Sequence, residues 1–187
     1  MHTPIDINPD EFRRALTPQV IFSFQIVPGV ILLSVLIFAA AVFYVASTTP
    51  SPSDPESLNT INILSIIHVF VATGCYLLSM MLYDRQFRIN RDGPSGVAVQ
   101  SASPAEAASH GVNLIRKATI LRLALIEGPA FFGLAVCLIA ALNGVLHEHP
   151  EYWGNGLSAV ILVLSIIFTF PNSDRLTAVY NEKIRTL

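Results

Sequence analysis

The chain has 187 residues, of which 52% are hydrophobic and only 13% are charged, and its formal net charge is −2. Soluble domains usually carry about 25% charged residues, so this composition excludes an ordinary soluble domain. A very apolar soluble bundle would need polar faces at helical spacing, and the apolar runs of this chain have none. We therefore expect the lipid bilayer to be the main partner of the chain, and we expect no nucleic acid partner.

Four apolar runs lie between clusters of charged residues. Since a helix rises about 1.5 Å per residue, about 20 residues cross a hydrocarbon core of about 30 Å. We predict an all-α, polytopic integral membrane protein, a single membrane domain whose four transmembrane helices form an antiparallel bundle. The predicted spans are residues 20–46, 60–83, 119–145 and 157–171. The first run begins too late and is too long for a cleaved signal peptide, so we expect none.

The N-terminal segment is polar, and residues 8–11 (Asn-Pro-Asp-Glu) are typical of a helix start. Asparagine can cap a helix, proline suits its first turn, and acids favour its positive end. A short interfacial helix through Phe12 and Leu16 should precede the first span. Within that span Pro28 removes a backbone donor, and Gln25 should face a neighbouring helix. The loop 47–59 contains three prolines and should be extended or turn-like.

Polar side chains interrupt the second span, among them His68, Thr73 and Cys75. A lone histidine in a membrane span is expected to form a hydrogen bond to another helix, with haem ligation as the alternative. Cys75 and Cys137 are predicted to lie at different depths in the membrane, so they should stay unpaired.

The structure of the loops and the tail can be predicted from their composition. Residues 92–111 are rich in Gly, Ala, Ser and Pro, which predicts a flexible cytoplasmic linker. In the loop 143–156, His147 and His149 are two residues apart and do not share a helical face. An ordinary solvated loop is therefore favoured over a metal site, and we expect no metal or other cofactor. The tail, residues 173–187, should be cytoplasmic and begin as a short amphipathic helix.

The distribution of charge predicts the topology. All eleven Lys and Arg residues fall on one side of the four-span arrangement. By the positive-inside rule, both termini and the long middle loop are cytoplasmic. Because nothing in the sequence directs the chain elsewhere, we expect a multi-pass protein of the cell (inner) membrane.

Glu127 is the one acid within an apolar segment. A charge at that depth costs several kcal/mol, so the carboxyl should be protonated, paired or in contact with a cavity. It is predicted to lie near the membrane midplane, with Gln25 and Thr73 at comparable depth. These three residues form a hypothetical ion-binding site. Alternatively, Glu127 is a neutral fastener between helices, bonded to Gln25, Thr73 or a backbone carbonyl freed by Pro129.

Residues 124–136, ALIEGPAFFGLAV, resemble the carboxylate helix of the rotor-ring proteolipid (c subunit) of rotary ATPases. In both, small and apolar residues precede the acid, and an aromatic-Gly-Leu sequence follows it, here Phe132, Gly133 and Leu134. The resemblance implies that Glu127 carries an ion. The partner helix of that family is rich in glycine, whereas the second span here contains only Gly74.

Two functions follow as hypotheses. The first is a structural or accessory membrane protein, such as a subunit of a larger membrane complex or a homo-oligomer. The alternative is a proton or cation translocating component that uses Glu127. The sequence contains no nucleotide-binding loop, zinc-protease signature, haem-attachment motif or pair of acids, so we predict no enzyme and no catalytic residue.

Overall fold

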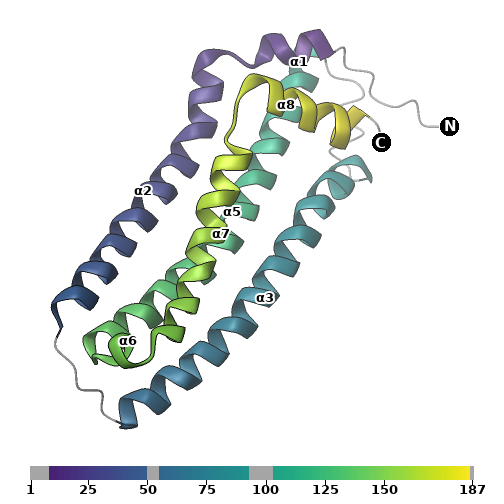
Figure 1. The fold of residues 1–187 in the computed structure, drawn as a ribbon. Helices are drawn as coiled ribbons and strands as arrows, with labels where there is room; N and C mark the ends of the chain where they lie inside the picture. The colour runs from purple at the N-terminus through teal and green to yellow at the C-terminus, as the bar shows by residue number, and fades with distance from the viewer. Residues whose placement is uncertain (1–8, 50–54, 93–102, 186–187) are drawn as a thin grey trace. The chain divides into compact units, whose positions relative to one another are not determined.

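The computed structural model describes residues 9–49, 55–92 and 103–185, and this part of the chain is almost entirely helical and contains no strand. The elements in chain order (Figure 1) are α1 (Pro9–Ala15), α2 (Pro18–Thr48), α3 (Pro55–Asp92), α5 (Pro104–Leu142), α6 (Val145–Glu148), the 3₁₀ helix η1 (Pro150–Gly156), α7 (Leu157–Thr169), α8 (Ser173–Tyr180) and the π-helical turn η2 (Asn181–Arg185).

Among the residues that the structure describes, four helical segments are long and apolar enough to cross a membrane: Pro18–Thr48, Glu56–Arg88, Ala105–Leu142 and Pro150–Thr169. The predicted all-α class, with four helices that are able to span a membrane, is therefore confirmed for the described residues. Each of the long helices α2, α3 and α5 begins at a proline. Proline suits this position because the first helical amide has no partner in the helix.

The flexible linker predicted at residues 92–111 is wrong over residues 104–111, which form the first turns of α5. Residues 93–102 lie outside the described part of the chain. The reason for the error is a capping box. The Ser103 hydroxyl accepts from the Glu106 amide at 3.4 Å, and the Glu106 carboxylate accepts from the Ser103 amide at 2.8 Å. These bonds satisfy amides that lack a partner in the helix, so the helix begins earlier than composition indicates.

Smaller elements occupy the remaining connections. The short helix expected near the N-terminus is confirmed as α1, which ends one residue before Leu16. The segment predicted as the loop 143–156 holds α6 and η1, separated from α5 by Gly144 with a φ of 71°. The tail helix is confirmed as α8, whose Asn172 cap accepts from the Arg175 amide at 2.8 Å.

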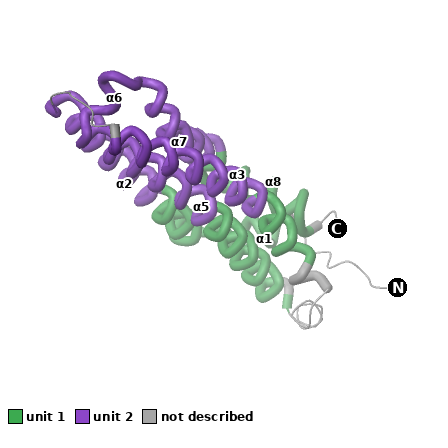
Figure 2. The backbone as a smooth tube through the Cα atoms, turned by 90° about the horizontal axis from the view of Figure 1, so that it is seen from below, with its two compact units in different colours: residues 1–28, 80–122, 169–187 green, residues 29–79, 123–168 purple. Residues whose placement is uncertain are grey.

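The chain divides into two compact units (Figure 2). Unit 1 comprises residues 1–28, 80–122 and 169–187, and unit 2 comprises residues 29–79 and 123–168.

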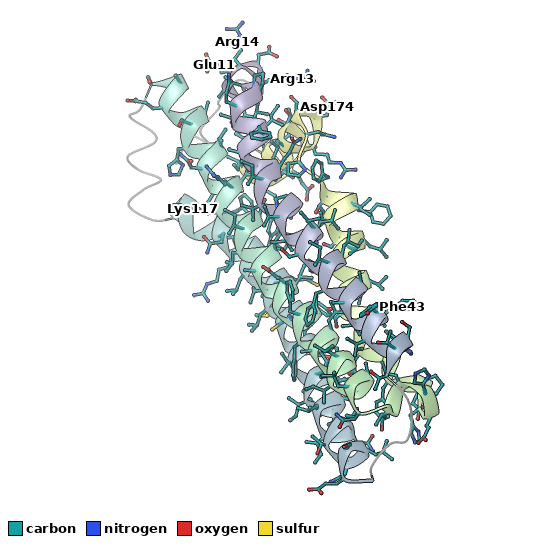
Figure 3. The ribbon with its side chains drawn as sticks, turned by 90° about the vertical axis from the view of Figure 1, so that its left-hand side faces the viewer. Glu11, Arg13, Arg14, Phe43, Lys117 and Asp174 are labelled. Carbon is teal, nitrogen blue, oxygen red and sulfur yellow. The ribbon has the colours of Figure 1, made fainter. Side chains whose placement is uncertain are left out.

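The core of unit 1 joins α1 and α8 to the segments of α3 and α5 in that unit. The rings of Phe12 and Tyr180 stack with centroids 4.0 Å apart, and both side chains are fully buried. Arg13 and Asp174 form an ion pair of 2.7 Å (Figure 3). Lys183 contacts Asp84 at 3.0 Å, and this hydrogen bond raises the pKa of Lys183. Both ends of the chain that the structure describes are thus fixed to one core.

The core of unit 2 is apolar and includes segments of α2, α3 and α5 together with α6 and η1. Its buried members are Ala46, Ile61, Val136, Ala140, Ala141, Val145, Leu146 and Tyr152. Phe38 of α2 stacks on Phe131 of α5 with centroids 5.9 Å apart. In contrast, Phe43, Phe70 and Phe168 are 68%, 74% and 69% exposed. Large apolar side chains in such number on the surface are typical of helices that face lipid.

Candidate functional site

A buried histidine lies at the centre of a polar cluster in unit 2. His68 of α3 is 4% exposed. Its Nδ1 lies 3.1 Å from Asn155 Oδ1 of η1. Its Nε2 lies 3.1 Å from the Pro129 carbonyl of α5 and 3.1 Å from Ser158 Oγ of α7. One side chain therefore contacts three other helical elements.

The orientation of the Asn155 amide follows from its partners. Asn155 Nδ2 lies 2.9 Å from Ser65 Oγ and 3.0 Å from the Tyr152 carbonyl oxygen. Because a carbonyl can only accept, the nitrogen of the amide must occupy this side. Asn155 Oδ1 therefore faces His68, and His68 Nδ1 must carry a proton.

Tyr152 extends the cluster through both its side chain and its backbone. Its hydroxyl donates to Asn62 Oδ1 at 2.7 Å. Its carbonyl also accepts from Cys137 Sγ at 3.6 Å. Three polar residues of α3, Asn62, Ser65 and His68, are thus bonded to η1, and the bonds link α3, α5, η1 and α7 within the unit.

Gly133 makes the close packing around the histidine sterically feasible. A Cβ atom at this position would collide with the Asn155 carbonyl oxygen and would lie 2.8 Å from His68 Nε2. The neighbouring Phe132 packs edge-on against the imidazole, with centroids 5.6 Å apart and an interplanar angle of 80°. Only glycine lets η1 and α3 approach α5 this closely.

This arrangement confirms the helix-to-helix hydrogen bond that was predicted for His68 and does not fit the haem alternative. Both ring nitrogens contact protein groups at 3.1 Å, so neither presents a lone pair to an external iron. Within the described residues, no three His, Cys, Asp or Glu side chains are placed to hold a metal ion. The chemistry that the cluster can perform is the exchange of protons and hydrogen bonds among buried groups.

The three residues of the hypothetical ion-binding site lie on three different helices, α2, α3 and α5. Glu127 lies half-buried on α5 in unit 2. Gln25 belongs to unit 1, and its Nε2 donates to the Pro171 carbonyl at 2.9 Å. Thr73 is exposed on α3, and its hydroxyl donates to the Val69 carbonyl at 2.8 Å. The donors of Gln25 and Thr73 are thus occupied by backbone carbonyls, and the ion-binding role of Glu127 stays a prediction.

Two further sequence predictions concern the remaining candidate ligands. His149 Nδ1 lies 3.0 Å from Glu151 Oε1, an exposed pair at the start of η1. The contact lies at the surface, but the segment is not the predicted solvated loop, because it carries α6 and η1 with buried side chains. Cys75 and Cys137 are both free, as predicted.

Sequence reasoning missed most of the residues around His68, although a signal was present. Asn62, Ser65 and His68 are spaced three residues apart and lie on one face of a helix. Asn155 and Ser158 repeat the same spacing. Periodic polar residues in apolar segments predict a polar contact between helices, but they do not show which helices meet.

No protein-family model, curated protein or solved structure matches this chain.

Proposed function

We propose that the protein is a structural or accessory component of the cell (inner) membrane, a subunit of a larger membrane complex or a homo-oligomer, and not an enzyme. The observation that supports this function is the use of the buried polar groups in unit 2. His68 and Asn155 direct their hydrogen bonds to other helices of the same chain. Polar contacts of this kind fasten membrane helices, because lipid offers polar groups no alternative partner.

We also propose that the spans form an antiparallel bundle with both termini in the cytoplasm. Within unit 2, Ile61 clusters with Val136 and Ala140, while His68 meets Pro129. Later residues of α3 thus contact earlier residues of α5. This pairing supports an antiparallel arrangement of the two helices. All eleven Lys and Arg residues belong to unit 1 and none to unit 2. This asymmetry supports a cytoplasmic location for the termini and the segment between α3 and α5.

The second candidate is translocation of protons or cations through Glu127. It is favoured by the position of a half-buried carboxyl two residues before Pro129 within α5. Because proline has no amide hydrogen, the Leu125 carbonyl lacks its usual helical donor. Two oxygen acceptors are thereby available on nearby residues of one span. The resemblance of residues 124–136 to the rotor-ring carboxylate helix supports the same candidate.

A flux measurement distinguishes the two candidates. The protein is reconstituted into proteoliposomes, and proton and sodium flux are recorded for the wild type, Glu127→Gln and Glu151→Gln. Glu151 is an exposed acid and serves as the matched control. A structural role predicts the flux of protein-free vesicles for all three. Flux that is present in the wild type and in Glu151→Gln but lost in Glu127→Gln establishes translocation instead.

The accessory role has a separate test in the native membrane. Solubilised in mild detergent, the protein should migrate in a larger particle than the purified monomer does. Cross-linking and mass spectrometry of that particle then distinguish a homo-oligomer from a complex with other membrane proteins. Migration as a monomer under all solubilisation conditions would contradict the proposal.

A further inference from the structure

The two ring nitrogens of His68 each face an oxygen atom that can only accept a hydrogen bond. Asn155 Oδ1 lies 3.1 Å from Nδ1, and the Pro129 carbonyl oxygen lies 3.1 Å from Nε2. A neutral imidazole has one N–H and one lone pair, so it can donate to only one of them. An imidazolium has two N–H groups and donates to both. The positions of these acceptors match the charged form of the ring.

Ser158 provides the one partner that suits either form. Its Oγ lies 3.1 Å from Nε2. With neutral His68, the hydroxyl can donate to the Nε2 lone pair, but this lone pair then also faces the Pro129 carbonyl at an unfavourable distance. With the imidazolium, Nε2–H donates to Pro129, and the hydroxyl is released from its role as donor. The change requires movement of hydrogen atoms only.

We propose that His68 is a proton-binding site within the membrane-spanning part of the chain. The ligand is a proton, bound at Nε2 and shared with the Pro129 carbonyl, while Nδ1 stays bonded to Asn155. This inference goes beyond the proposed function and holds for either candidate. A positive charge at this position strengthens the contact of α3 with α5 and η1, so proton uptake tightens the cluster.

The surrounding charges are compatible with this site. Unit 2 contains no Lys or Arg that would repel an imidazolium. On α5, the ionisable residues of the unit are Glu127, close to Pro129, and Cys137. On η1 they are Glu151, which is exposed, and Tyr152.

The remaining elements of unit 2 add no Lys or Arg. In unit 2, α3 contributes Glu56, Cys75 and Tyr76 besides His68, and α2 contributes only Tyr44. α6 contributes His147, which is exposed, and Glu148, and His149 lies between α6 and η1. α7 has no ionisable side chain between Leu157 and Thr169. A buried charge needs hydrogen bonds on all its donors, and Asn155 and Pro129 accept from the two N–H groups of the imidazolium.

Nuclear magnetic resonance of the full chain in lipid nanodiscs tests the proposal. The protein carries ¹⁵N-histidine and ¹³C-carbonyl proline and is titrated from about pH 8 to about pH 5, which brackets the ordinary histidine midpoint of about 6.5. We expect both His68 nitrogens to become protonated in the folded protein, and the Pro129 carbonyl resonance to shift at the same pH. His68→Gln assigns the resonances, and His147→Gln, at an exposed position, leaves them unchanged.

Ser158→Ala provides a second test that does not alter the histidine. The neutral form loses its only donor to Nε2, whereas the imidazolium keeps Pro129 and Asn155 as acceptors. The ratio of imidazolium to neutral form at a given pH should therefore rise about fivefold, the equivalent of one net hydrogen bond. A fall in this ratio would overturn the assignment of the proton to Pro129. Persistence of the neutral Nδ1–H form of His68 down to about pH 5 would overturn the site itself.

Discussion

At the residue scale, Gly133 controls how closely η1 can approach α5. The first atom that a Cβ at this position would meet is the Asn155 carbonyl oxygen. A backbone oxygen cannot rotate away as the end of a long side chain can. Gly133 also lies one helical turn after Pro129, on the same face of α5, so the approach that it permits brings His68 within 3.1 Å of the Pro129 carbonyl.

We predict that Gly133→Ala destabilises the protein by about 1–3 kcal/mol, the usual range for overpacking of a well-packed core. η1 must move outward, which weakens the bonds that Asn155 and His68 form. Thermal unfolding in detergent can be followed by the fluorescence of Trp153, the single tryptophan, which lies in η1.

Gly128→Ala is the matched control for this substitution. It lies on the same helix, but a Cβ there meets no atom within 4 Å. Alanine is favoured over glycine within a helix, so this variant should be as stable as the wild type or slightly more stable. Equal destabilisation by the two substitutions would show that close packing at Gly133 is not the cause.

At the scale of the element, α5 is longer than a membrane span requires. Its 39 residues correspond to roughly 58 Å at about 1.5 Å per residue, compared with a hydrocarbon core of about 30 Å. The additional turns begin at the Ser103 cap and carry Glu106, Arg116 and Lys117, charged residues that belong outside the hydrocarbon core. The backbone hydrogen bond from Ser103, followed by the bond from its hydroxyl, lowers the pKa of Glu106 below its ordinary value of 4.5.

We predict that Ser103→Ala loosens the first turns of α5. Loss of an N-cap serine costs about 1 kcal/mol, so amide hydrogen exchange in the first turn, residues 105–107, should accelerate about fivefold. Since folding lowers the pKa of Glu106, its contribution is complete above pH 4.5 and is lost as the pH falls through the folded-state value. The difference in amide exchange rate between Ser103→Ala and the wild type should therefore become smaller at acid pH. Ser109→Ala, exposed within the helix, should not accelerate exchange.

At the scale of the whole molecule, the sequence predicts the spans well because each is a long apolar run. The number of spans and the helical class follow from hydropathy alone. The Asn-Pro pair at residues 8 and 9 predicts α1, and the amphipathic pattern of the tail predicts α8. The start of α5 could also have been predicted, because Ser103 and Glu106 form a capping box.

The polar cluster could be predicted only in part. The spacing of Asn62, Ser65 and His68 marks a polar face on α3, but the partner of that face depends on tertiary packing. The ion-binding site was predicted at Glu127 because placing a carboxyl within a membrane span costs free energy. His68, which can be neutral, is a weaker signal in the sequence even though its contacts are the more extensive ones in the structure. The need for glycine at position 133 arises only from the approach of η1, a segment that was predicted to be a loop.

The placement of charge leads to a prediction about the whole molecule. Arg122 lies over the Tyr83 ring, with its guanidinium carbon 5.4 Å from the centroid, and both residues belong to unit 1. An arginine on an aromatic ring is typical of the boundary between the hydrocarbon core and the headgroups. Beyond this pair, residues 55–82 of α3 and 123–142 of α5 contain no Lys or Arg, which is typical of segments that cross a membrane.

We therefore predict that residues near α6 face the outside and that the start of α5 faces the cytoplasm. His147 and Ala105 are both exposed, so a cysteine at either position is accessible to a thiol reagent. In spheroplasts, a membrane-impermeant maleimide should label His147→Cys, whereas Ala105→Cys should react only after lysis. The wild type is the control, because Cys137 is buried and Cys75 lies within a span, so neither should react. The prediction rests on the retention of loops that carry Lys and Arg on the cytoplasmic side. Labelling of Ala105→Cys before lysis, with protection of His147→Cys, would show the opposite topology.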